Sequence, residues 1–553
     1  MKKSIIEKFL EKKILLSPDL FEEIQMKGES VLLSVDISDS VVVLNKDIIS
    51  INNSDIDFVT FDKIRVLYEK NKDEKKYQAL LSVLKKETSK RSETTVSENT
   101  QFRNNSSIEI IFNYEEPSKK RSYSDFVDFF NMRFSVLEKI LRKRQELHSS
   151  TSINRVLQKK EKETISIIGM VYEKSLTKNN NIIIKLEDST GFIDVMISKN
   201  REDIYEQAKD ICLDEVIGVT GSLSGNSNMF SNKILFVNNL YFPDVPADRE
   251  YKKLSEEKFL IVLGDPQVGS DKFLEKEFHR FLLWIQGKIG NDVQREIAKK
   301  TKYILIPGDL IEGVGVYPGQ EEELLIKDIK EQYSYLASLL SNIPSDKEII
   351  VCPGNHDAGR LAEPQPPLYK DFAETLWNMP NVHILSNPAL INIEKTKDFP
   401  GFDILIYHGS SLIYYSENID SIRTKGGQKR PDLLMKYLLQ KRHLSPTHEA
   451  SLYVPDPKRD PLVIETVPDF LITGHIHRSS VSNYKNTTLI NASCWVDISE
   501  NQIKRGLEPE PARVPIINLQ TRDVKIMNFS RKKESKQEIE NYFTEESKTR
   551  VEV

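Results

Sequence analysis

The chain has 553 residues, 39% of them hydrophobic and 29% charged, with a formal net charge of -5. This length is enough for about two to four domains, and the slightly acidic balance excludes a protein that coats nucleic acid over its whole surface. Three cysteines without a Cys-x-x-Cys pair argue against a disulfide framework or a zinc ribbon and fit a reducing cytoplasm. Charged residues interrupt the apolar start, and no apolar run approaches the roughly 20 residues that span a bilayer, so we expect a cytoplasmic protein without a membrane contact.

The first 160 residues indicate helices on either side of a polar linker. Residues 1–70 predict a small N-terminal helical unit, because apolar residues near its start recur at helical spacing. Residues 71–121 are rich in Lys, Glu, Ser, Thr and Asn and contain few aromatic residues, which predicts a disordered linker. Residues 122–160 predict a helical segment, with apolar positions that repeat from Phe126 to Leu141.

Residues 163–243 contain five strand-like runs separated by turns rich in Asn, Gly and Ser. A helix-like stretch, residues 203–211, falls between the third and fourth runs. Five strands with a helix in this place are typical of an OB-fold, which commonly binds single strands. A small β-barrel used only for protein contact is the alternative, because no surface aromatics are evident on these strands.

Between residues 255 and 530, five short apolar runs each lead into a residue that can bind a metal ion. Such a run before a Gly-containing turn predicts a strand buried on both faces. The runs are residues 259–263, 303–306, 349–352, 404–407 and 470–473. Helical stretches, residues 275–288, 321–341, 369–377 and 431–440, separate them. Because ligands bind beyond the carboxyl ends of strands in open α/β sheets, we expect one site built from five loops.

The side chains after these runs predict a centre for two metal ions. Aspartate, asparagine and histidine suit divalent ions such as Mn, Fe or Zn. His475 and His477, two residues apart, can face one cavity, and the single carboxylate of Asp309 can bridge two ions. Two ions about 3.5–4 Å apart can deprotonate a water for in-line attack on phosphorus. We expect His356 to steady or protonate the leaving oxygen, with Asp357 holding its ring.

Each of these signals is weak alone, since a lone His-x-His is more often a surface or core feature and a lone Gly-Asp is usually a turn. Together the segments resemble the calcineurin-like metallophosphoesterases and, more closely, the small subunits of archaeal family-D DNA polymerases. The discriminating stretches are residues 308–320, 353–366, 441–446 and 514–519. The resemblance covers roughly residues 122–530. It implies a multidomain α/β protein in which an OB-fold β-barrel precedes a metallophosphoesterase αββα sandwich.

The resemblance also implies an activity, a cofactor and partners. Small subunits of this family bind a large subunit that carries polymerisation, and they contribute a 3′-to-5′ proofreading exonuclease acting on single-stranded 3′ ends of DNA. The exonuclease uses two metal ions, typically Mn, with Fe, Zn or Mg as alternatives. One ion would be held by Asp265, Gln267, Asp309 and His477. The other would be held by Asp309, Asn355, His408 and His475, with His356 as the catalytic histidine.

Position 267 departs from the family pattern, which is Asp-x-His where this chain has Asp265-Pro266-Gln267. An amide oxygen is a poorer ligand for a borderline ion than imidazole, so we expect weaker occupancy of the first site or a preference for Mn over Zn. Two interpretations stay open: an active exonuclease, and a structural assembly subunit whose site is weakened or inactive. A free-standing phosphoesterase is a third interpretation, against which the family-specific stretches and the OB-like unit argue.

The charged segment 531–553 predicts a flexible tail. Within it Ile539, Tyr542 and Phe543 have the spacing that places them on one face of a helical turn. This pattern resembles the motif that docks onto sliding clamps. A tail without a partner is the alternative interpretation.

Overall fold

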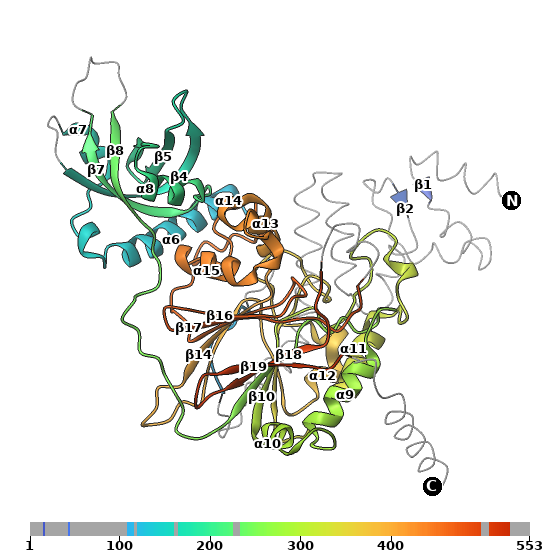
Figure 1. Cartoon of the computed structure of the whole chain (residues 1–553). Coiled ribbons are helices and arrows are strands. Elements are labelled where there is room, and N and C mark those ends of the chain that lie inside the picture. The colour runs from blue at the N-terminus through green and yellow to red at the C-terminus, as the bar shows by residue number, and fades with distance from the viewer. Residues whose placement is uncertain are drawn as a thin grey trace, which may run out of the picture. The chain divides into compact units, whose positions relative to one another are not determined.

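The computed structural model describes residues 108–115, 119–159, 164–224, 233–498 and 508–530 (Figure 1). It also describes the backbone of two short strands, β1 (Leu15–Leu16) and β2 (Val43–Leu44), which pair in parallel. Apart from β1 and β2, the helical unit expected over residues 1–70 lies outside the described residues. So does the tail of residues 531–553, with its Ile539, Tyr542 and Phe543.

A closed barrel confirms the OB-fold. Its strands are β4 (Thr164–Leu176), β5 (Ile182–Asp188), β6 (Gly191–Ile197), β7 (Val216–Leu223) and β8 (Ile234–Tyr241), in the order β4-β5-β6-β8-β7. Helix α8 (Glu202–Lys209) lies between β6 and β7, as predicted. Alternating side chains such as Ile167, Ile184 and Val195 fill the interior, which fixes the register of each strand.

The outer face of the barrel differs from the prediction, because Tyr172 of β4 and Phe192 of β6 are exposed aromatic residues. Their relative exposures are 55% and 50%, and their ring centroids lie 5.2 Å apart. Before the barrel, the chain forms α6 (Tyr123–Leu141), the 3-10 helix η2 (Gln145–Leu147) and α7 (Ile153–Gln158). A capping box starts α6, in which the Ser122 N–H donates to Asp125 Oδ2 at 2.6 Å.

Two six-stranded sheets form the rest of the fold, and all five predicted apolar runs are strands in them. The first sheet has the order β12 (Val382–Ile384), β11 (Glu348–Val351), β10 (Thr301–Ile306), β9 (Phe259–Val262), β18 (Arg513–Asn518) and β19 (Val524–Asn528). The second has the order β16 (Ser480–Tyr484), β17 (Thr487–Asn491), β15 (Phe470–Thr473), β14 (Phe402–Tyr407), β13 (Ala389–Ile393) and β3 (Ile108–Phe112).

The sheets and helices make an αββα sandwich, which confirms the predicted fold class. Apolar side chains of the two sheets, among them Leu260, Tyr303, Ile350, Ile404 and Ile472, form one core. The first sheet packs with α9 (Glu275–Ile285), α10 (Asp292–Lys300), α11 (Ile329–Leu340) and α12 (Lys370–Trp377). The second packs with α13 (Leu412–Asn418), α14 (Asp420–Arg423) and α15 (Pro431–Lys441). Two 3-10 helices, η3 (Gln320–Glu322) and η4 (Gly427–Lys429), lie in the loops.

Two predicted segments need correction. The linker prediction for residues 71–121 is wrong over β3, which pairs antiparallel with β13 as the edge of the second sheet. In β3, Ile108 is buried and Ile110 and Phe112 are partly buried, whereas Glu109 and Ile111 are exposed. The helix predicted over residues 321–341 begins only at Ile329, because the Asp328 carboxylate caps it by accepting from the Lys330 and Glu331 N–H groups.

Over the described residues, none of the helices is both long enough and apolar enough to cross a bilayer.

Candidate metal centre

The candidate ligands lie beyond the carboxyl ends of five strands, and the structure brings most of them together. Asp265 follows β9, Asp309 follows β10, and Asn355 follows β11 in the first sheet. His408 follows β14 in the second sheet, and His475 and His477 follow β15. Two groups have ligand atoms within 4.8 Å of one another: Asp309, His408 and His475, and Asp265, Asp309 and His477. Asp309 belongs to both groups, as expected for a bridging carboxylate.

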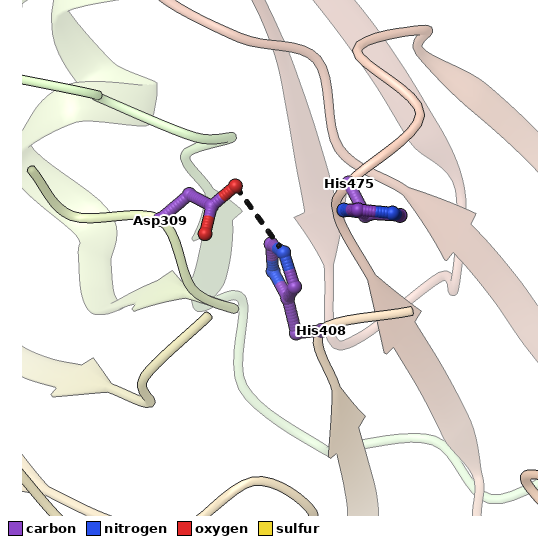
Figure 2. A group of neighbouring side chains, drawn as sticks. All are labelled: Asp309, His408 and His475. Carbon is purple, nitrogen blue, oxygen red and sulfur yellow. Dashed lines mark ion pairs between the residues drawn. The ribbon is translucent and has the colours of Figure 1, made fainter. Parts of the chain in front are cut away.

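The group around His408 joins the two sheets. His408 Nε2 lies 3.3 Å from Asp309 Oδ2 and 2.9 Å from Asn355 Oδ1. Figure 2 shows the facing Asp309 and His408 side chains with His475 beside them, and the two imidazole centroids are 5.0 Å apart. Two oxygen acceptors therefore converge on one ring nitrogen, an arrangement that either an Nε2–H group or a bound cation satisfies.

The group around Asp265 is held by backbone amides. His477 Nε2 lies 3.2 Å from Asp265 Oδ2, which also accepts from the His475 N–H at 2.9 Å. Asp309 Oδ1 accepts from the His356 N–H at 2.9 Å. Because each carboxylate is fixed by an amide from another loop, its remaining lone pairs have a defined direction.

Four candidate ligands have left-handed backbone conformations. The φ angles are 44° at Gln267, 49° at Asp309, 69° at His475 and 57° at His477. This conformation costs roughly 1–2 kcal/mol per residue, although Asp and His adopt it more often than branched residues do. Strained residues gathered at one place indicate a functional site, since the surrounding fold must hold them there.

Two glycines leave the space that the carboxylates occupy. A Cβ atom at Gly354 would lie 2.2 Å from Asp309 Oδ1, and one at Gly474 would lie 2.5 Å from Asp265 Oδ1. Any larger residue at either position would therefore displace a candidate ligand.

The residues present fit divalent metal ions. Asp265 and Asp309 are almost completely buried, and among the described atoms Asp265 Oδ1 and His408 Nδ1 are buried without a hydrogen-bond partner. A buried carboxylate oxygen without a partner is costly, and a bound cation removes that cost. Carboxylate, amide oxygen and imidazole are ligands suited to Mn, Fe or Zn.

The two histidines beside Asp309 have pKa values shifted in opposite directions. Burial opposes the ionisation of Asp309, but the charges of His408 and His356 hold the pKa of Asp309 below its usual range. Burial likewise opposes a charge on His408, yet Asp309 raises the pKa of His408 to about 9. Burial, reinforced by His408, lowers the pKa of His475 to about 3. His475 is thus neutral at pH 7, the state in which imidazole binds a metal.

Gln267 is buried, and its backbone N–H lies beside Asp309 of this centre. Its N–H donates to the Asp309 carbonyl oxygen at 2.9 Å, which ties the loop after β9 to the loop after β10. Its role as a ligand to the first ion stays a prediction.

The assignment of Asp357 to the His356 ring is wrong. Asp357 Oδ2 accepts from the Gly354 N–H at 2.8 Å and the Leu310 N–H at 3.1 Å, and Oδ1 accepts from the Tyr333 hydroxyl at 3.0 Å. Burial raises the pKa of Asp357 to about 7. Adjacent residues in this tight turn point in different directions, so Asp357 binds the loops together and does not contact the imidazole.

Glu312 makes the contact with the His356 ring that was expected of Asp357. His356 Nδ1 lies 2.8 Å from the Glu312 carbonyl oxygen and 3.7 Å from Glu312 Oε1. The Tyr317 hydroxyl lies 3.2 Å from Glu312 Oε1 and 2.8 Å from Glu323 Oε2, and Gln320 Nε2 donates to the Glu312 carbonyl oxygen at 2.9 Å. The Tyr317–Gln320 stretch therefore shapes the support of the imidazole. Sequence reasoning missed Glu312, for which the available signal was a carboxylate three residues after Asp309.

A pair of buried amides, Gln365 and Asn387, links two ligand loops. The backbones of Gln365 and Asn387 exchange two hydrogen bonds, of 2.7 and 2.9 Å, and Asn387 Nδ2 donates to Gln365 Oε1 at 2.8 Å. Gln365 Nε2 donates to the Gly354 carbonyl oxygen at 2.9 Å, and Asn387 Oδ1 accepts from the His408 N–H at 2.9 Å. The pair thus sets the separation of Asn355, next to Gly354, from His408. Asn387 was missed, although its place between two apolar runs was a usable signal.

Comparisons with known proteins agree with this geometry. The calcineurin-like phosphoesterase family matches residues 259–479, which include every candidate ligand, and the OB-fold nucleic acid binding domain matches residues 165–239. The DNA polymerase II small subunit of Methanothermobacter thermautotrophicus is 36% identical over 419 residues, which are 75% of this chain and 82% of that protein. The chain belongs to the family of DNA polymerase II small subunits.

Other DNA polymerase II small subunits have similar identity. That of Archaeoglobus fulgidus is 38% identical over 392 residues, covering 71% of this chain and 74% of its own. That of Pyrococcus abyssi is 37% identical over 408 residues, covering 73% of this chain but only 63% of its own. The similarity to this family of small subunits thus extends over both the barrel and the sandwich.

Proposed function

We propose that this small subunit carries a two-metal 3′-to-5′ exonuclease that removes nucleotides from single-stranded 3′ ends of DNA during replication. The observation that carries the proposal is the position of Asp309, whose carboxylate belongs to both groups of candidate ligands. The name of the relatives, small subunits of a DNA polymerase, supports a large catalytic subunit as the partner. A cytoplasmic location stays a prediction.

The geometry supports hydrolysis of a phosphodiester. When bound, two divalent ions, with Mn as the first choice, supply Lewis-acid stabilisation and an activated water. Asp265 and Asp309 are oriented for this by backbone amides. His356 is only partly buried, and its Nδ1 is engaged by Glu312, so Nε2 is the atom that would donate a proton to the leaving O3′ oxygen. The nearby carboxylate of Glu312 stabilises the charged imidazole that this role requires.

The experiment is an assay of the reconstituted two-subunit complex with Mn and a primer that has a mismatched 3′ end. We expect shortening of the primer that is abolished by EDTA and absent from an Asp309→Ala complex. Equal residual degradation by the wild-type and Asp309→Ala complexes would move the chain to the alternative, a structural subunit with an inactive site. Gln267 is the residue that favours this alternative, because an amide replaces a stronger ligand.

We also propose that the tail binds a sliding clamp through Ile539, Tyr542 and Phe543. The support is the spacing of these residues in the sequence. Deleting residues 531–553 should abolish binding to the clamp while leaving binding to the large subunit intact. Retained clamp binding by the truncated chain would refute the assignment.

A further inference from the structure

A groove with a volume of about 450 Å³ lies beside the loop that carries His475 and His477. Ile476 and Arg478 of that loop form one side of the groove. The rest is formed by Ser416 and Glu417 of α13, Arg423 of α14, Gly426, the 3-10 helix η4, and Glu508. Helix α13 begins at Leu412, four residues after His408, so both sides of the groove continue directly from loops of the metal centre.

Three of the ten residues that line the groove are basic, and two, Glu417 and Glu508, are acidic. The segment from Arg423 to Arg430 contains four basic residues among eight, on either side of Gly426 and Gly427. Of these, Arg423 and Lys429 line the groove, and Arg478 faces them from the loop after β15. The glycines have φ angles of 122° and 55°, which only glycine adopts readily, so they permit the tight turn that brings Lys429 toward Arg478.

The Glu508 carboxylate contacts one cation on each side of the groove, Lys429 and Arg478. Glu508 Oε1 lies 2.6 Å from Lys429 Nζ, and Glu508 Oε2 lies 3.7 Å from one Arg478 Nη atom. The other Arg478 Nη atom lies 3.6 Å from Glu510 Oε1. Arg423 is paired separately with Asp420 at 2.6 Å. The side chains of Lys429 and Glu508 are 49% and 60% exposed, and exposed pairs of this kind contribute at most about 1 kcal/mol. A phosphate, with two anionic oxygens, can therefore take the place of the Glu508 carboxylate at little cost.

We propose that this groove binds the phosphates of a single DNA strand whose 3′ end lies at the metal centre, with Arg423, Lys429 and Arg478 as the phosphate contacts. The proposal rests on the proposed nuclease function, since that function supplies the strand. It adds a substrate path on the side of the His475–His477 loop. It also assigns Glu508 as an internal competitor for two of these cations, Lys429 and Arg478.

The test is the binding of a fluorescently labelled single-stranded oligonucleotide to the full-length chain in EDTA, measured over a range of salt concentrations. Each phosphate contact contributes roughly 0.7 to the slope of log affinity against log salt for single strands, so replacing three contacts should reduce the slope by about 2. We expect the triple variant Arg423→Ala, Lys429→Ala and Arg478→Ala to bind at least tenfold more weakly. Glu508→Gln should bind more tightly than the wild type, because the competitor is neutralised.

Two exposed cations outside the groove provide matched controls. Arg295 and Lys395 also form exposed ion pairs, and Arg295→Ala and Lys395→Ala should keep the wild-type affinity and slope. An unchanged slope in the triple variant, no gain in Glu508→Gln, or no measurable binding by the wild type would overturn the proposal. So would a triple variant that binds DNA normally but no longer binds the large subunit, because the groove would then be a protein interface.

The two proposals fail separately. Binding in EDTA does not need bound metal ions. If the triple variant binds DNA as the wild type does, only the proposed path of the DNA strand is therefore refuted. Absence of metal-dependent hydrolysis of a small phosphodiester by the wild-type complex refutes the proposed nuclease activity. It does not change the interpretation of the DNA-binding result.

Discussion

The imidazole of His356 rests against Glu312, with Nδ1 2.8 Å from the Glu312 carbonyl oxygen and 3.7 Å from its carboxylate. The hydrogen bond to the carbonyl oxygen orients the ring, and the carboxylate faces the positive charge that the ring carries before it donates its proton. The two neighbours of this imidazole, Glu312 in space and Asp357 in sequence, therefore have separable roles.

Glu312→Gln should lower the exonuclease kcat by about tenfold, because it keeps the carbonyl bond but removes the carboxylate charge. Its thermal stability should change little. Asp357→Asn should instead lower the free energy of unfolding by about 1–3 kcal/mol, since Asp357 Oδ2 accepts from two backbone amides. Rate assays and thermal melts of both variants check this pair. A loss of kcat in Asp357→Asn with an unaffected Glu312→Gln would contradict the assignment.

Asn387→Ala should reduce Mn binding at the site that contains His408. The substitution removes the acceptor for the His408 N–H and the donor to Gln365, so Asn355 and His408 lose their fixed separation. Titration with Mn should show one tight site in place of two. Asn392→Ala is the matched control, because Asn392 is also a buried amide but is bonded to Asp403 at 2.8 Å, at the opposite end of β14 from His408. Equal Mn binding by the two variants would show that Asn387 has only a general structural role.

Gln267→His should strengthen the site that contains Asp265 and His477. An imidazole is a better ligand than an amide for borderline ions, so we expect Zn affinity at this site to rise by about tenfold or more. Competition between Zn and a chromophoric chelator measures the change. An affinity equal to that of the wild type would show that residue 267 is not a ligand.

His443 should make the stability of the fold depend on pH. Its Nε2 lies 2.8 Å from Asp460 Oδ2, and its Nδ1 accepts from the Ser445 N–H at 2.9 Å. Burial and then Arg133 lower the pKa of His443 to about 4, although Asp460 opposes this. The unfolded chain, with a pKa of roughly 6.5, binds a proton that the folded chain does not bind between these values. The stabilisation is thus complete above pH 6.5 and is lost as the pH falls toward 4, by at most about 3 kcal/mol.

Melting temperatures at pH 5 and pH 7 check this sign. The wild type should melt at a lower temperature at pH 5, and His443→Gln should show a smaller difference between the two pH values. An equal difference in both proteins would show that other groups cause the pH dependence.

The places of the candidate ligands were predictable because each of these residues lies in the loop that follows a buried strand, so a local pattern fixes its position. Glu312 and Asn387 were not, because their contacts depend on how loops from different strands meet. Asp357 shows the same limit, since sequence adjacency to His356 does not give the direction of its side chain. β3 was missed because its stability comes from pairing with β13, as in the register of Ile108 with Ile393, and not from its polar surroundings in the sequence.

The central claim, a dinuclear centre that shares Asp309, is tested most directly by electron paramagnetic resonance of the chain loaded with Mn. We predict two Mn ions per chain with a spin-coupled spectrum, and loss of the coupling in Asp309→Ala. A single uncoupled Mn ion, or a coupled spectrum that persists in Asp309→Ala, would contradict it.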